Sequence, residues 1–175
     1  MAIHGNAVHH RPEVGTYVID PEQSAVRFRI RNFFGLVVVR GTFAVSRGEV
    51  VVADPATSST VEAVISAASI DTGNEKRDTH VREAAFLDVA THAEMHFRGE
   101  RVEAGDEAHL LHGRLTVRGI SKPAALTLDT VSGDERRLVV HAVTTVDRYA
   151  FGVTKGKGSM GRHLTLDLDV VAERR

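Results

Sequence analysis

The side chains of Arg77, Asp78 and His80 are the chemically active groups with the most suggestive spacing in the chain. On a helix, residues three apart share a side, so Arg77 and His80 would present a guanidinium and an imidazole together. They would then form a polar cluster that orients the head group of a ligand at the opening of a cavity. Alternatively the cluster is structural: Asp78 near the helix start interacts favourably with the helix dipole, and Arg77 anchors a loop. Residue types and spacing leave both interpretations open.

A catalytic interpretation requires His80, together with Asp78, to act as acid and base on a bound substrate. The His80 side chain would then have to point into a cavity, within reach of the ligand head group. The segment 119–123 lacks the second glycine of a nucleophile elbow. No spacing identifies a Ser-His-Asp triad, because triads assemble from distant positions. We therefore predict no catalytic residue and a protein that is not an enzyme.

Two further motifs resemble cofactor or metal sites but are better explained as a loop and a strand. Gly156–Gly161 matches G-x-G-x-x-G, yet a strand is expected after it, and the chain ends before the acid that binds a ribose about 20 residues on. This loop would suit a barrel mouth, where Lys155 and Lys157 would meet an anionic head group. His92–His96 has alanine where a zinc protease has glutamate, and it alternates like a strand with Met95 inward. We predict no cofactor and no metal site.

Composition narrows the range of partners. The 175 residues include no cysteine, which excludes disulfides and thiolate metal sites. The 22 Lys and Arg residues against 23 Asp and Glu give a net charge of −1, which offers no electrostatic case for nucleic acid or an anionic membrane as partner. No run of about 18 apolar residues occurs, so no transmembrane segment is predicted. The first residues lack the apolar run of roughly 7–15 residues found in a signal peptide, which predicts a cytoplasmic protein.

Alternation of apolar and polar residues dominates the chain and predicts strands. In residues 26–31, apolar side chains alternate strictly with arginine, which gives one dry face and one wet face, as in an antiparallel sheet. Turn signals such as Arg47-Gly48 and Ala104-Gly105-Asp106 separate the strands. Eight or nine strands are predicted in this way, over residues 26–31, 37–45, 49–52, 61–65, 94–97, 115–118, 124–128, 138–146 and 164–170.

One segment breaks the alternation and predicts a helix. Thr72, with Glu75 three residues on, resembles a capping box in which Thr72 is the N-cap. Good helix formers follow, with an apolar stripe at helical spacing. The pattern predicts a helix over residues 75–85. Residues 15–175 are expected to form one domain, preceded by a flexible N-terminal arm over residues 1–14.

Many strands with little helix leave a sandwich or a barrel as the fold. Closure into a barrel removes exposed strand edges. A barrel of about eight strands is either filled by its own side chains or holds one small ligand. A filled barrel would serve only as a partner-binding module, and the alternation alone does not decide between these forms.

Several motifs follow one another in a distinctive order between Thr16 and Val171. They are Tyr17-Val18-Ile19-Asp20, Arg40-Gly41-Thr42-Phe43, Ser69 to Asn74, Arg77 to Arg82, Phe86-Leu87-Asp88, Met95-His96-Phe97, Gly113 to Pro123, and Arg148 with Phe151 and Gly152. Together they resemble the YceI-like family, which is described as lipid- or polyisoprenoid-binding. The chain departs from the family's usual residues at Gln23 and Asn32, where histidine is common. Both replacements keep hydrogen bonding but lose titration.

The resemblance implies a mainly β fold, namely a single antiparallel eight-stranded, lipocalin-like β-barrel with one or two short helical insertions. It also implies an internal apolar tube that binds a long polyisoprenoid or fatty-acid derivative, and no other cofactor. Small inward residues such as Ala63 and Ala142 would leave room for the chain. Because family members often pair, and because Val64, Val139 and Val143 are expected to face outward, a homodimer is predicted.

In a ligand barrel the inward residues are also the binding residues. The apolar chain is therefore expected to contact Phe28, Ile30, Phe33, Phe43, Phe86, Phe97, Leu115, Leu128, Val140, Phe151 and Leu166. The head group is expected at a mouth formed by Asn32, Arg77, His80 and Arg148.

Overall fold

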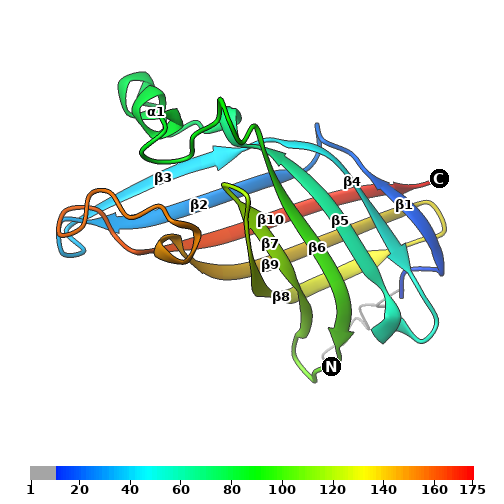
Figure 1. The fold of residues 1–175 in the computed structure, drawn as a ribbon. Coiled ribbons are helices and arrows are strands. Elements are labelled where there is room, and N and C mark those ends of the chain that lie inside the picture. The colour runs from blue at the N-terminus through cyan, green and yellow to red at the C-terminus, as the bar shows by residue number, and fades with distance from the viewer. Residues whose placement is uncertain (1–10) are drawn as a thin grey trace, which may run out of the picture.

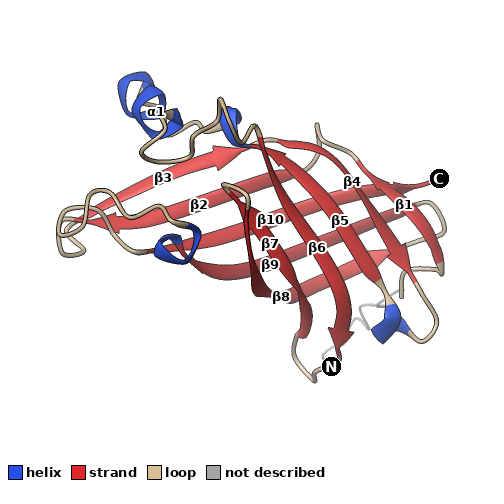
Figure 2. Cartoon of the chain, viewed as in Figure 1, coloured by secondary structure: helices blue, strands red, loops and turns tan. Residues whose placement is uncertain are grey.

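The computed structural model describes residues 11–175, and within that range the chain forms ten strands, one α-helix and three short 3-10 turns (Figure 2). The strands are β1 (Gly15–Ile19), β2 (Ala25–Asn32), β3 (Val37–Phe43), β4 (Val45–Val52), β5 (Thr60–Ser66), β6 (Glu94–Glu103), β7 (His109–Val117), β8 (Ile120–Gly133), β9 (Arg137–Asp147) and β10 (His163–Arg174). The helix is α1 (Glu75–Arg82), and the 3-10 turns are η1 (Ala56–Ser58), η2 (Ala67–Ser69) and η3 (Arg148–Phe151). The predicted arm over residues 1–14 lies mostly outside the described range.

The strands close into an antiparallel barrel (Figure 1). In the described part of the chain, the pairing order β1-β4-β5-β6-β7-β8-β9-β10 returns from β10 to β1, so eight strands complete the ring. Strand β10 pairs with β1 through residues 172–174 and with β2 through residues 164–169. The β2–β3 hairpin therefore prolongs the barrel at one end. The prediction of a mainly β, eight-stranded barrel with a short helical insertion is confirmed.

Antiparallel neighbours place their connections alternately at the two ends of the barrel. One end, called the α1 end below, carries the β2–β3 turn, the β5–β6 connection with α1, the β7–β8 turn and the β9–β10 connection with η3. The other end, called the terminal end, carries η1, the β6–β7 loop and the β8–β9 turn, and there Tyr17 pairs with Arg174. Figure 1 shows the α1 end at the left and the carboxyl terminus at the right.

Strand β2 shows how the alternation sets the register. Phe28 and Ile30 are buried, whereas Arg27 and Arg29 are exposed. Phe28 lies opposite Leu166 of β10. A slip by one residue would turn every side chain of β2 to the other face and bury its arginines without partners.

The predicted turn at Arg47-Gly48 is wrong, because both residues lie inside β4. The β4–β5 register shifts there between Val45 and Arg47, as in a β-bulge. A Cβ on Gly48 would lie 2.5 Å from Ile19 Cδ1. Glycine at this position therefore permits a close approach between strands rather than a turn.

Helix α1 is capped differently from the prediction. The N-cap is Asn74, whose side chain accepts a hydrogen bond from the Arg77 backbone N–H at 3.0 Å, and the helix ends at Arg82 instead of residue 85. Thr72 is not the cap, because its N–H and its hydroxyl both donate to the Asp78 carboxylate. Within residues 11–175, no helix is long and apolar enough to cross a membrane.

The segment of residues 67–93 covers the barrel beside the edge strand β3. Thr42 of β3 and Asp71 exchange two backbone hydrogen bonds, which attach the segment to this edge. Arg82 donates to the carbonyls of Ala68 and Ile70, so the helix is tied back to its own connection. An exposed strand edge is a site for unwanted pairing, and this segment partly shields it.

A charged cluster on the outer face joins β8, β9, β10 and β2. The His141 ring lies 2.5 Å from Asp129 through Nδ1 and 2.5 Å from Asp167 through Nε2. Arg27 in turn pairs with Asp167 and Asp169. Hydrogen bonds to Asp129 and then to Asp167 raise the pKa of His141 above its ordinary value.

The His141 cluster predicts a pH-dependent stability. A raised folded-state pKa means that protonated His141 stabilises the fold, fully below the unfolded pKa of about 6.5. This contribution is lost as the pH rises through the folded pKa. Urea unfolding across this range should show a falling free energy of unfolding for the wild type and a flatter profile for His141→Phe. An NMR titration that placed the ring pKa at or below the ordinary value would contradict the prediction.

Candidate ligand-binding cavity

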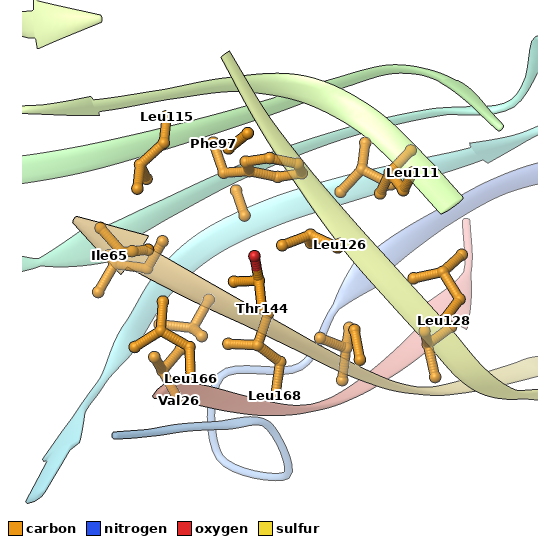
Figure 3. A pocket seen from close by; sticks show the side chains of 18 of the residues that line it. Val26, Ile65, Phe97, Leu111, Leu115, Leu126, Leu128, Thr144, Leu166 and Leu168 are labelled. Carbon is orange, nitrogen blue, oxygen red and sulfur yellow. The ribbon is translucent and has the colours of Figure 1, made fainter. Parts of the chain in front are cut away.

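The barrel encloses a cavity of about 1140 Å³, lined by side chains from all ten strands described (Figure 3). Strand β9 illustrates the lining, because every second residue from Leu138 to Val146 faces the cavity. Most of the lining side chains are aliphatic or aromatic. The hydroxyl of Thr144, which points into this space, donates to the Ala125 carbonyl at 2.8 Å, so its polar atom is satisfied.

Small residues on the inner wall help to keep the space open. Ala142 of β9 lies opposite Leu168 of β10 and Leu128 of β8, in the middle of the barrel. Ala142 and Ala63 both line the cavity, as their strand registers predict. The cavity exceeds the usual range of about 300–1,000 Å³ for small-molecule sites.

Ten of the eleven apolar residues predicted to contact a ligand line the cavity. They are Phe28, Ile30, Phe43, Phe86, Phe97, Leu115, Leu128, Val140, Phe151 and Leu166. Phe28 and Phe43 also contact each other, with ring centroids 5.4 Å apart. Of the 67–93 segment, the predicted contacts include Phe86 but not Ile70, Val81 or Leu87, which also line the cavity. Only the packing of that segment over the barrel turns these side chains inward.

Phe33 does not line the cavity. Its side chain is 54% exposed, because β2 ends at Asn32 and Phe33 begins the turn to β3 with φ of 50°. The alternation of a strand no longer determines side-chain direction once the chain enters a turn. The structure therefore corrects the inward placement of this residue.

Arg148 lines the cavity at the α1 end but uses its guanidinium for structure. It is 5% exposed and donates to the carbonyls of Gly161, Val153, Lys155 and Met160 at 2.6–3.2 Å. These bonds shape the β9–β10 connection around one cation. Burial lowers the pKa of Arg148, yet an arginine remains charged in proteins.

Asn32 lines the same end and binds the same connection. Its side-chain oxygen accepts a hydrogen bond from the Gly161 N–H at 2.9 Å. A Cβ on Gly161 would lie 2.2 Å from the Arg31 carbonyl oxygen, so the connection packs tightly on the end of β2. The Asn32 amide is thus engaged with the backbone of the β9–β10 connection.

Arg77 and Asp78 share Thr72 as partner. The Arg77 Nε donates to the Thr72 hydroxyl at 2.8 Å and Nη2 donates to the Thr72 carbonyl at 3.1 Å, while the side chain also borders the cavity. Asp78 is buried and accepts from Thr72. Burial alone would raise the pKa of Asp78, but the Thr72 hydrogen bonds and the nearby Arg82 and Arg77 lower it below its ordinary value. Asp78 therefore fits the structural interpretation. Arg77 makes structural contacts with Thr72 and also has a side chain at the cavity border.

His80 does not lie at the mouth. Its Nδ1 is 3.3 Å from Glu83, the side chain is half exposed, and it is not among the cavity-lining residues. The ring packs edge-on against Phe86, with centroids 5.0 Å apart. On α1, His80 is turned toward solvent while Arg77 is turned toward the cavity. The catalytic use of His80 with Asp78 required the opposite orientation and is not supported.

Arg118 holds the α1 end together and was not singled out by its sequence. Its Nη1 donates to the Gly152 carbonyl at 2.7 Å and its Nη2 to the Ala84 carbonyl at 3.3 Å. It thereby joins the 67–93 segment to η3. Only its placement in the β7–β8 turn, with φ of 52°, brings it between these segments.

Acidic side chains border the cavity at the terminal end. Asp54, Asp106 and Glu107 come from the β4–β5 and β6–β7 connections, and Arg11 and His109 lie in the same lining. The turn signals in the sequence predicted these two loops. They carried no information that the loops lie together at the same end of the barrel. The cavity thus extends between an end with Arg77 and Arg148 and an end with several carboxylates.

The remaining motifs adopt the structures expected of them. Residues 156–161 form a turn-rich loop, with Gly156 and Gly158 at φ of 82° and 90°, and β10 follows. His96 lies within β6, with Met95 and Phe97 lining the cavity. The valines expected outside the barrel, Val64, Val139 and Val143, are not part of the lining.

An eight-stranded antiparallel barrel around an apolar cavity defines a lipocalin-like protein. Residues 17–172 match the YceI-like domain, and the chain belongs to this family. UPF0312 proteins of Shewanella sp. (strain W3-18-1) and of Shewanella oneidensis are 29% identical to it over 168 residues, which cover 91% of this chain and 87% of each relative.

Solved structures share the fold. BcnA of Burkholderia cenocepacia superposes with a TM-score of 0.79 at 21% identity, over 87% of this chain and 98% of that protein. A polyisoprenoid-binding domain from Saccharophagus degradans gives a TM-score of 0.72 at 14% identity, over 93% of this chain and all of that one (100%). At these sequence identities, the structural similarity shows a shared fold and nothing further.

Proposed function

We propose that this protein binds, stores or carries one long-chain apolar lipid, a polyisoprenoid or fatty-acid derivative, inside the barrel. The observation that carries the proposal is the apolar cavity of about 1140 Å³ along the barrel. Burial of each methylene there contributes about 0.8 kcal/mol to binding. The polyisoprenoid-binding domain of Saccharophagus degradans, which has the same fold, supports the same class of ligand.

The position of the lining residues favours an elongated ligand over a compact one. The lining reaches Met160 and Arg148 at the α1 end and Asp106 and Glu107 at the terminal end. A chain-like molecule fills such a space with few voids, whereas a compact molecule would leave part of the apolar wall without contacts.

Arg77 is the group best placed to meet a polar head. It borders the cavity, and two of its nitrogens bind Thr72, while its Nη1 has no hydrogen-bond partner among the described residues. A phosphate or carboxylate would accept a charge-assisted hydrogen bond there. The carboxylates at the terminal end would repel an anionic head group. They therefore also favour an orientation in which the head group lies at the α1 end, beside Arg77.

Mass spectrometry under native conditions, followed by organic extraction, tests the proposal. The wild-type protein is expected to carry or accept one chain-bearing lipid. Ala142→Phe places a ring in the middle of the cavity and should reduce loading about tenfold or more, since it removes room for several methylenes. Thr145→Phe, on the exposed side of the same strand, is the matched control and should load like the wild type.

Repeated failure to find or load any such lipid in the wild type would overturn the proposal. Equal loading of the Ala142→Phe and wild-type proteins would place the ligand elsewhere.

The open interior argues against the filled-barrel alternative, in which the protein is only a partner-binding module. Carriage between locations, a cytoplasmic location and the homodimer remain predictions. A light-scattering mass near 19.0 kDa at micromolar concentration would contradict the dimer.

A further inference from the structure

We propose that the β2–β3 turn docks this protein onto an anionic lipid bilayer. Four large apolar side chains within five residues, in this turn and at the start of β3, are exposed: Phe33 by 54%, Phe34 by 93%, Leu36 by 84% and Val37 by 44%. Single exposed apolar residues are ordinary, but several gathered at one projecting turn indicate a binding surface. The turn extends the barrel beyond its closed ring (Figure 1).

The backbone conformation of the turn is unfavourable for phenylalanine, so the stability of the fold does not explain why Phe33 and Phe34 occur there. Phe33 and Phe34 have φ of 50° and 59°, in the left-handed region that bulky side chains avoid. The Leu36 N–H donates to the Phe33 carbonyl at 3.1 Å, so Phe34 and Gly35 are the central residues of the turn, and central positions of this hand favour asparagine and glycine. Two phenylalanines are thus strained and exposed at once, a combination that points to a function for the rings.

The charge around the turn is a second, independent observation. Residues 28–48 and 148–166, which form this end of the barrel with the turn, contain no acidic residue. Arg47 pairs with Glu94 and Arg162 pairs with Asp147. Five further exposed cations in these ranges have no ion-pair partner among residues 11–175, and they are Arg29, Arg31, Arg40, Lys155 and Lys157. The net charge of −1 for the whole chain hides this local excess.

The cations also repel one another within the protein. Arg29 and Arg40 are direct partners across β2 and β3, and like charges in such positions destabilise a sheet. Acidic partners on the outer face of β10 begin only at Asp167, opposite Arg27 and farther from the turn. An anionic surface would relieve the repulsion between Arg29 and Arg40.

A bilayer explains the combination better than a second copy of the chain. In a twofold-symmetric dimer the same surface meets itself, so unpaired cations would face cations. On a membrane, the apolar side chains enter the boundary of the acyl chains while lysine and arginine bind anionic head groups. The neighbouring 67–93 segment has five acidic and three basic residues, a net charge of −2. The excess of cations is therefore confined to the β2–β3 hairpin and the β9–β10 connection, which face the bilayer in this proposal.

The docking surface also adjoins the cavity. The Phe33 N–H donates to the Ser159 carbonyl at 2.7 Å, and Asn32 and Met160, next to these residues, line the cavity. Docking would thus present the α1 end of the cavity to the bilayer. The proposal rests on the surface alone, so its test does not depend on any cavity ligand.

The chain contains no tryptophan, which permits a direct fluorescence test with Phe34→Trp. Vesicles of phosphatidylglycerol and phosphatidylcholine should shift its emission to the blue, and brominated acyl chains should quench it. Vesicles of phosphatidylcholine alone should have a much weaker effect. Raising the ionic strength from about 0.1 M to about 1 M should weaken binding, because the Debye length falls from about 10 Å to about 3 Å. Val18→Trp, exposed on β1, is the control and should not respond.

Vesicle co-sedimentation separates the two contributions. Phe34→Ser with Leu36→Ser should reduce binding to anionic vesicles about tenfold or more, and Lys155→Gln and Lys157→Gln about fivefold each. Val18→Ser should bind like the wild type. The proposal is overturned if Phe34→Trp and Val18→Trp respond equally or not at all to anionic vesicles. It is also overturned if the Phe34→Trp emission shifts with protein concentration alone while the mass doubles, which would assign the turn to self-association.

Discussion

Replacement of Phe28 with arginine is expected to abolish lipid loading and to lower the free energy of unfolding by about 3–5 kcal/mol. The Phe28 side chain is 6% exposed, lies in the middle of β2 and faces the cavity. A Cβ on Gly41 of β3 would lie 2.5 Å from the Phe28 ring, so the ring occupies the space that this glycine leaves. An arginine there would place an unpaired charge against an apolar wall.

Arg29→Ala is the matched control, one residue further along the same strand. Arg29 is exposed on the outer face and has no ion-pair partner among the described residues. Its removal should change stability by no more than about 0.5 kcal/mol, as for an ordinary surface substitution, and leave loading intact. Urea unfolding and native mass spectrometry of both variants measure the two effects. If Arg29→Ala abolished loading while Phe28→Arg did not, the inner and outer faces of β2 would be the reverse of those described.

The second large effect is expected for Arg148→Met, which should lower the free energy of unfolding by about 3–5 kcal/mol. Methionine keeps much of the side-chain volume but provides no donor, so the carbonyls of Gly161, Val153, Lys155 and Met160 lose their shared partner. Each buried acceptor left without a hydrogen bond costs about 1–3 kcal/mol unless water reaches it. Faster amide hydrogen exchange in the β9–β10 connection should accompany the loss.

Arg162→Met controls for the loss of a charge in the same connection. Arg162 pairs with Asp147 at 2.8 Å on the exposed surface and lowers the pKa of that carboxyl to about 2. Solvent screens an exposed pair of this kind, so it contributes little to stability and this variant should remain close to the wild type. Arg148→Lys should fall between the two, because a single ammonium cannot reproduce the planar fork of a guanidinium. Equal stability of Arg148→Met and Arg162→Met would show that the four carbonyls are satisfied without Arg148.

The membrane proposal changes how the charge balance of the chain is understood. A net charge of −1 offered no case for an anionic surface. A sum over the whole chain, however, does not describe how charges are distributed. Unpaired cations gather around the β2–β3 hairpin and the β9–β10 connection, whereas Asp54, Asp106 and Glu107 border the cavity at the terminal end. Partner predictions from net charge hold only where the two signs are mixed over the surface.

The sequence by itself determined most of the inner wall. Alternation in β2 and β10 assigns Phe28 and Leu166 to one face and Arg27 and Asp167 to the other, because burying unpaired charges costs far more than burying apolar groups gains. Ten apolar wall residues follow from such local patterns and from the family motifs. Local patterns also predicted the helix, although its cap is Asn74 and not Thr72.

Only the tertiary structure decided how the ends of the barrel are built. His80 and Arg77 share a helix, yet their different surroundings turn one toward solvent and the other toward the cavity. Arg148 collects carbonyls from residues 153–161, and the left-handed turn directs Phe33 outward. These outcomes depend on loop conformation and on contacts between residues far apart in the chain. Periodicity carries no information on loop conformation or on such long-range contacts, because it indicates only which side of a regular strand or helix a residue occupies.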